Sequence, residues 1–93
     1  MKKYIRNEDL VWEEVGGELV VLDYNKGKVY TLNDTAFEIW RILEKKASFK
    51  EIFAYLLLCH TGYNKSEMRS DLEEILNNFM KISLILEVKK NKK

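Results

Sequence analysis

The side chains of this chain that could carry out chemistry are few, and they do not form a usual catalytic set. The single histidine, His60, directly follows the single cysteine, Cys59. Neighbouring side chains on a helix point about 100° apart, whereas a nucleophile and its base must lie within hydrogen-bond reach. The pair is therefore a poor catalytic dyad, and no second histidine is present to build a metal site. We interpret His60 as a helix-end residue and Cys59 as part of the core.

Acidic pairs and glycines give no stronger signal for catalysis. Carboxylates could in principle pair for acid–base work, but the solvated face of a strand or helix is the commoner setting for Glu13, Glu14, Asp71, Glu73 and Glu74. The four glycines form neither a GxGxxG motif nor a phosphate-binding loop. The sequence thus predicts no enzymatic activity, no cofactor and no metal.

Length and composition indicate one small folded domain. With 93 residues, 46% hydrophobic and 33% charged, the chain is long enough for a single core. We expect this core to span about 9–87, followed by a basic tail at 88–93. The formal net charge of +1 gives no strong field for nucleic acid or membranes. A lone cysteine suits a reducing compartment, and no apolar run is long enough to cross a membrane, so we expect a cytoplasmic protein.

Three short runs between Leu10 and Leu32 have the composition of β-strands. They read LVWEEV, ELVVLDY and KVYTL, and they are separated by Gly16-Gly17 and by an NKG sequence. Glycine adopts positive φ at little cost, so both separators favour tight turns. The sequence predicts a three-stranded antiparallel meander in which the middle strand, apolar on both faces, is central.

After Leu32 the hydrophobic period changes to that of helices. We predict helices over 35–45, 49–60 and 65–82. Thr35 to Glu38 and Ser48 to Glu51 both fit a capping box, and Asn64 to Glu67 is a weaker third case. Apolar residues recur at helical spacing in each predicted helix, and we expect them to face the core: Ala36, Ile39, Trp40, Leu43; Ile52, Phe53, Leu56, Cys59; Met68, Leu72, Ile75, Leu76, Phe79 and Ile82.

The run at the end of the third helix and the aromatic residues are assigned separately. The run SLILEV at 83–88 fits either a fourth short strand or the packed end of the third helix. The large aromatic residues stand at core spacing, whereas Tyr30 has a polar tip that can reach water. The residues that we assign to the core on this basis are Trp12, Phe37, Trp40, Phe49, Phe53 and Phe79.

This order of elements is that of an α+β fold resembling a winged helix-turn-helix, with a three-stranded antiparallel sheet followed by three helices. Such a fold first suggests a DNA-binding transcriptional regulator. The predicted third helix, however, carries three basic and four acidic residues, a sum of −1. A recognition helix usually neutralises several phosphates, so the charge argues against this alternative. A structural interaction module without peptide specificity is a third possibility.

The segment YTLNDTAFEIW, which enters the first helix, and the late ILNNF segment resemble the PqqD-like family. Members of that family are leader-peptide recognition domains in pathways that make ribosomal, post-translationally modified peptides. The resemblance covers about residues 9–87. The family usually has glycine where the third helix ends, and Ser83 stands there in this chain.

The resemblance implies a winged-helix variant that does no chemistry itself. A leader peptide would add as a strand beside the third strand, in a cleft shared with the third helix. The partners would be the precursor peptide and a pathway enzyme such as a leader peptidase, a cyclase or a radical S-adenosylmethionine enzyme. Lasso peptides, thioether peptides and the quinone cofactor are the possible products, and a free domain of this length looks most like the lasso-type subunit. We expect a monomer, although an open strand edge permits swapping.

The residues are physically compatible with this role. Glu13 and Glu14 protect the first strand against pairing, whereas the third strand carries only Lys28 as a charge, so the third strand is the better acceptor of a guest strand. Residues of the third helix would supply a pocket, with burial against the other helices as their alternative role. The predicted peptide-binding residues are Lys28, Val29, Tyr30, Thr31, Leu32, Met68, Arg69, Asp71, Leu72 and Ile75.

Overall fold

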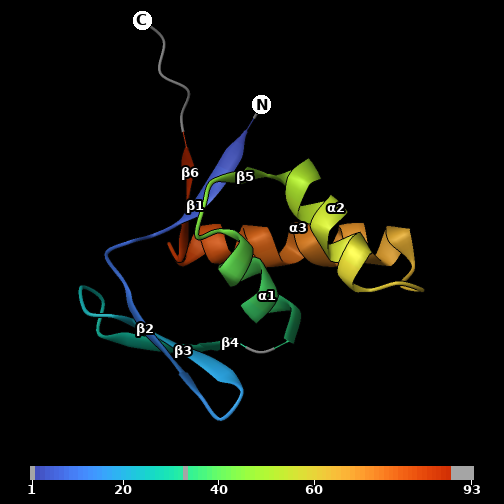
Figure 1. Ribbon diagram of the computed structural model, residues 1–93. Coiled ribbons are helices and arrows are strands. Elements are labelled where there is room, and N and C mark those ends of the chain that lie inside the picture. The colour runs from blue at the N-terminus through green and yellow to red at the C-terminus, as the bar shows by residue number, and fades with distance from the viewer. Residues whose placement is uncertain (1, 33, 89–93) are drawn as a thin grey trace, which may run out of the picture.

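The computed structural model describes residues 2–32 and 34–88, and it contains two three-stranded antiparallel sheets and three helices (Figure 1). The α+β class is confirmed. The predicted single sheet of three strands is incomplete, because three further strands form a second sheet. The elements are β1 (Lys3–Arg6), β2 (Val11–Val15), β3 (Glu18–Asp23), β4 (Lys28–Leu32), α1 (Asp34–Ile42), β5 (Ala47–Ser48), α2 (Phe49–Cys59), α3 (Lys65–Lys81) and β6 (Ile85–Val88).

The predicted meander is confirmed as the sheet with strand order β2-β3-β4. Val15 pairs with Glu18, which leaves only Gly16 and Gly17 in the loop, and their φ values are 57° and 85°. Two central residues with positive φ make a type I′ turn, whose twist matches that of the strands. Central β3 buries Leu19 and Val21 on one face.

The second sheet, with order β5-β1-β6, was not predicted as a sheet. Its central strand, β1, pairs with β5 through Tyr4 and Ala47 and with β6 through Tyr4 and Glu87. The SLILEV run therefore forms a strand, one of its two predicted alternatives. Figure 1 shows this sheet at the opposite end of the molecule from the β2-β3-β4 sheet. The predicted basic tail lies mostly beyond residue 88, outside the described residues.

Helix α1 differs from its prediction at both ends. It begins at Asp34, so Thr35 lies inside the helix and is not its N-cap; residue 33, which precedes the helix, is outside the described residues. At the other end, Glu44 N–H donates to Arg41 and Lys45 N–H to Ile42, at N···O distances of 3.2 and 3.5 Å. These bonds span three residues, so the chain tightens and leaves the helix before Lys45.

The start signals of the other two helices are confirmed. Ser48 Oγ accepts from the Glu51 N–H at 3.2 Å while Glu51 Oε1 accepts from the Ser48 N–H at 2.8 Å, a complete capping box. Asn64 Oδ1 accepts from the Glu67 N–H at 3.1 Å. Helix α2 ends at Cys59, which is exposed. The prediction that Cys59 belongs to the core is wrong, because the buried face of α2 ends at Leu56 and Cys59 lies in the final turn.

Helix α3 ends in a Schellman motif built on a residue other than glycine. The Leu84 N–H donates to Phe79 at 2.8 Å and the Ser83 N–H to Met80 at 3.1 Å, which is the hydrogen-bond pair of that motif. Ser83 has φ 63°, so it occupies the left-handed conformation that favours glycine. The serine at this position therefore keeps the geometry but adds backbone strain.

One core joins both sheets to all three helices. Most predicted inward residues are buried, and Trp12 is the clear exception among the aromatic residues, with 44% of its surface exposed. It lies on β2, an edge strand whose five residues are all exposed. The fully or nearly fully buried hydrophobic residues are Leu10, Leu19, Val21, Leu32, Ile39, Trp40, Leu43, Ala47, Ile52, Leu56, Met68, Leu72, Leu76, Phe79, Leu84 and Ile85.

Candidate functional site: an open strand edge

Strand β4 presents one unpaired edge. It pairs with β3 from Leu19–Leu32 to Asp23–Lys28, and it is the last strand of its sheet in the part of the chain that the structure describes. In an antiparallel pair, alternate residues bond to the neighbouring strand while those between them point their N–H and C=O groups outward. The outer edge of β4 therefore carries free backbone donors and acceptors, as the sequence predicted for residues 28–32.

The two faces of β4 differ in burial. Tyr30 and Leu32 pair with Val21 and Leu19, whose side chains are fully buried, so this face of β4 packs on the core. Leu32 is buried and Tyr30 is half-buried. On the opposite face, Val29 is 60% exposed. The core face fixes the position of the strand, and the edge stays accessible.

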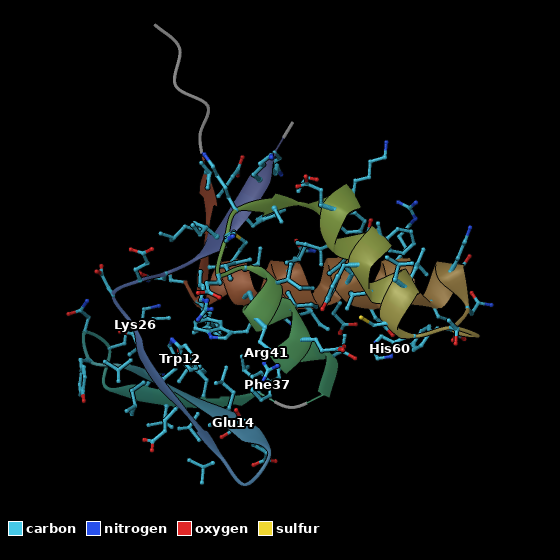
Figure 2. The ribbon with its side chains drawn as sticks, viewed as in Figure 1. Trp12, Glu14, Lys26, Phe37, Arg41 and His60 are labelled. Carbon is cyan, nitrogen blue, oxygen red and sulfur yellow. The ribbon has the colours of Figure 1, made fainter. Side chains whose placement is uncertain are left out.

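A lysine that the sequence did not single out connects the β3–β4 turn to α3. The Lys26 N–H donates to Asp23 Oδ1 at 3.2 Å, and Lys26 Nζ donates to the Ile82 carbonyl at 3.3 Å. Figure 2 labels Lys26 at the turn. Because Ile82 is the C-cap of α3, this contact joins the β3–β4 turn to the end of the helix. The two residues are 56 positions apart, so no local sequence signal indicated the contact.

The other edge of this sheet, β2, is engaged by side chains of the core and of α1 (Figure 2). Trp12 meets Trp40 edge-on with ring centroids 6.5 Å apart, and the Arg6 guanidinium lies over both rings at 4.9 and 5.3 Å. Glu14 forms an ion pair with Arg41 at 3.8 Å. Burial lowers the pKa of Arg6 from its ordinary value. Edge β2 thus carries more fixed side-chain contacts and more charge than β4.

The five predicted residues of α3 do not all reach the surface. Met68 and Leu72 are 2% and 0% exposed, so they belong to the core and can affect a ligand only through packing. Ile75 is partly buried against the same core. These residues therefore offer less pocket surface than the sequence suggested.

Arg69 and Asp71 point to different sides of α3. Two residues along a helix are separated by about 200°. Arg69 lies over the rings of Phe49 and Phe53 at 5.9 and 5.0 Å. Asp71 instead accepts from the Tyr63 hydroxyl at 2.7 Å, and this bond raises the pKa of Tyr63. The structure therefore does not place these two predicted peptide-binding residues on one face of α3.

The groups first considered for catalysis make structural contacts. His60 Nε2 lies 2.6 Å from Glu38 Oε1 and connects α2 to α1. The neighbouring Cys59 raises the pKa of the Tyr55 phenol. Over residues 2–32 and 34–88, no three His, Cys, Asp or Glu side chains gather as metal ligands would, and none of the helices there is both long and apolar enough to span a bilayer.

Comparison with known proteins adds family and fold. The profile of the family described as Coenzyme PQQ synthesis protein D (PqqD) matches residues 18–85. The structure of TbiB1 in complex with the TbiA(beta) leader peptide superposes with a TM-score of 0.79 at 19% identity, covering 92% of this chain and 99% of that one. Lasso peptide synthetase B1 complexed with the leader peptide gives 0.75 at 18% identity, covering 89% and 96%.

None of the curated protein sequences matches this chain significantly. The two solved structures share its fold over nearly their whole length, and the family profile spans the chain from β3 to the start of β6. The match includes the YTLNDTAFEIW segment and the ILNNF segment on which the sequence resemblance rested. The chain therefore belongs to the PqqD family.

Proposed function

We propose that this protein binds the leader segment of a ribosomally made precursor peptide by strand addition to the outer edge of β4. The bound leader presents the rest of the precursor to a separate pathway enzyme, and the domain itself does no chemistry. The observation that carries the proposal is the unpaired edge of β4 on a strand that the core holds in place. The two solved proteins of the same fold, each in complex with a leader peptide, support it.

Backbone pairing alone is too weak for this role. A hydrogen bond contributes about 0.5–1.5 kcal/mol net, while each ordered leader residue loses roughly 1–2 kcal/mol of backbone freedom. The net binding free energy must therefore come from apolar leader side chains, which contribute about 1.5–3 kcal/mol each when they are buried. The half-buried Tyr30 and Ile75, and the exposed Val29, are the apolar residues near the edge and on α3 that offer such contacts.

Among the peptide classes, the lasso pathway has the most support, because one of the two similar structures is a lasso peptide synthetase B1 complexed with the leader peptide. The enzyme partner would then be a leader peptidase or a cyclase. A DNA-binding role has less support. The helix that would enter the groove, α3, carries a net charge of −1, whereas a DNA-binding helix usually neutralises several phosphates.

Amide hydrogen exchange tests the strand addition residue by residue. In the free protein, the alternate amides of 28–32 that point outward should exchange fast, while those bonded to β3 should be protected. Adding a cognate leader peptide should slow only the fast set. Duplex DNA is the control, and both titrations are done at 150 mM salt. We expect DNA to leave the exchange pattern unchanged.

A proline substitution tests the same edge by affinity. Tyr30→Pro, or the neighbouring substitution if exchange assigns the outward amide to Thr31, removes one outward donor. We expect leader affinity to fall at least tenfold, since both a donor and the strand geometry are lost. The matched control is proline at an outward residue of β2, which should leave affinity unchanged. Unchanged leader affinity in the β4 variant, in a protein that remains folded, would refute pairing there.

A further inference from the structure

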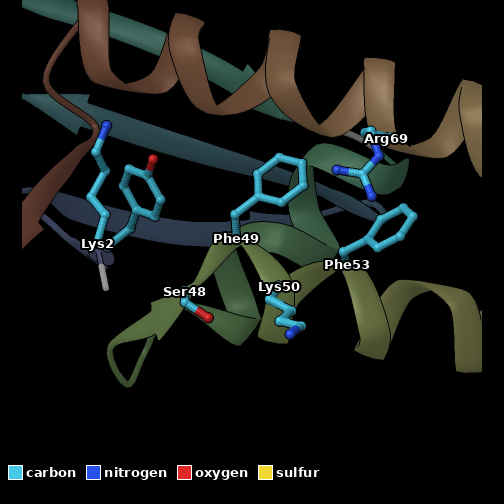
Figure 3. Close-up of a pocket in the computed structure, with 7 residues that line it drawn as sticks. Lys2, Ser48, Phe49, Lys50, Phe53 and Arg69 are labelled. Atoms are coloured by element: carbon cyan, nitrogen blue, oxygen red, sulfur yellow. The ribbon is translucent and has the colours of Figure 1, made fainter.

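A second surface lies away from the β4 edge. A cavity of about 400 Å³ opens between β1, β5, α2 and α3. Its apolar side is made by Phe49 and Phe53, whose rings stack with centroids 6.1 Å apart, and by Tyr4. Figure 3 shows Arg69 reaching from α3 toward these two phenylalanine rings.

The charged side chains that line this cavity are all basic. Lys2, Lys50 and Arg69 contribute three positive charges, and no acidic residue lines it. Among the described residues, none of these three cations forms an ion pair with a carboxylate. The nearby Glu51 is already occupied, because it accepts from the Ser48 N–H at 2.8 Å and pairs with Lys3 at 3.7 Å. An apolar floor under an uncompensated basic rim favours a ligand that is both apolar and acidic.

The cavity is separate from the leader edge. None of its lining residues comes from β2, β3 or β4. Lys2 precedes β1, and the others belong to the second sheet, to α2 and to α3. A strand lying along β4 would therefore leave the cavity open. An adaptor needs such a second surface, because it must hold the leader and an enzyme at the same time.

Resting on the function proposed above, we infer that this cavity docks an acidic, aromatic or aliphatic surface segment of the pathway enzyme while the leader occupies β4. Two features of the cavity set the chemistry of the segment. The stacked phenylalanines take one large apolar side chain, and the three cations take carboxylates on the residues beside it. Because these charges are solvent-accessible, attraction also accelerates the encounter and weakens with salt.

A hexapeptide of sequence GDFLEG, acetylated and amidated, is a suitable probe, with GKFLKG as the charge-inverted control. Titrated into isotope-labelled protein, the acidic peptide should shift the amide resonances of 48–53 and 66–73 and leave 28–32 unchanged. Arg69→Glu and Lys50→Glu should each weaken binding about tenfold, since an attraction becomes a repulsion of similar size. Lys45→Glu, at an exposed lysine outside the cavity, should change the affinity by less than twofold.

The leader is titrated into the same samples, so that the two proposals can fail separately. Equal leader affinity with and without saturating GDFLEG, and in the Lys50→Glu variant, supports two independent surfaces. Displacement of GDFLEG by the leader would overturn the enzyme assignment, because the cavity would then be part of the leader site. Equal binding of both hexapeptides, or no shift at 48–53, would overturn the docking surface while leaving leader binding at β4 intact.

Discussion

Replacing Ser83 by glycine should stabilise the protein. Ser83 has φ 63°, and holding a residue with a β-carbon in that conformation costs about 1–2 kcal/mol. Glycine removes this cost but loses roughly 0.5–1 kcal/mol more backbone entropy on folding. The net expectation is a gain of about 0.5–1 kcal/mol, which for a domain of this size raises Tm by ~2–8 °C.

The backbone contacts at this site should survive the substitution. The Ser83 carbonyl accepts from Asn7 Nδ2 at 3.0 Å, and the Asn7 N–H donates to the Leu84 carbonyl at 2.9 Å. Neither bond uses the serine hydroxyl. Glycine therefore keeps the connection between the N-terminal strand and the end of α3, and leader affinity should not change.

Thermal and urea unfolding of four proteins would check this argument. Asparagine also tolerates the left-handed conformation, so Ser83→Asn should lie between the wild type and Ser83→Gly. Ser83→Ala keeps the strain and removes only the hydroxyl, so we expect stability close to the wild type. A Tm for Ser83→Gly at or below that of the wild type would contradict the strain argument. A large loss in Ser83→Ala would show that the hydroxyl stabilises the turn.

Three further substitutions test the packing and the caps. Ser48→Ala should lower the free energy of unfolding by about 1 kcal/mol, measured in urea, because the N-cap acceptor of α2 is lost. In Glu51→Gln the Tm deficit relative to the wild type should be largest at neutral pH. The Ser48 N–H bond and Lys3 lower the pKa of Glu51, so the stability contributed by the Glu51 carboxylate is complete above the ordinary pKa of 4.5 and disappears as the pH falls through the lowered pKa. An equal Tm deficit at pH 7 and pH 3 would contradict this reasoning. Leu72→Ala should lower the free energy of unfolding by about 2–5 kcal/mol, since the side chain is fully buried. The folded fraction of this variant should bind the leader with unchanged affinity. A weaker affinity of the folded protein would show that Leu72 belongs to the peptide site.

Local signals in the sequence determined the elements whose partners are near in the chain. The β2-β3-β4 meander was predictable because each strand pairs with the next across a short turn, and Gly16-Gly17 readily adopts the positive φ values that a two-residue hairpin turn requires. The starts of α2 and α3 were predictable for a similar reason, since a cap and its bonded N–H lie three residues apart. The same locality made β4 recognisable as an edge strand with little protection.

Tertiary structure alone decided what depends on distant residues. Strand β1 has no local partner, and it exists because β5 and β6 bring their edges to it from the middle and the end of the chain. The helical periodicity placed Met68 and Leu72 on the apolar face of α3. It does not reveal which part of that face the other elements cover, and both residues proved to be buried. The basic cavity at Phe49 and Arg69 likewise combines two helices with two strands of the second sheet. Short-range chemistry fixes turns and caps, whereas surfaces arise only when remote segments meet.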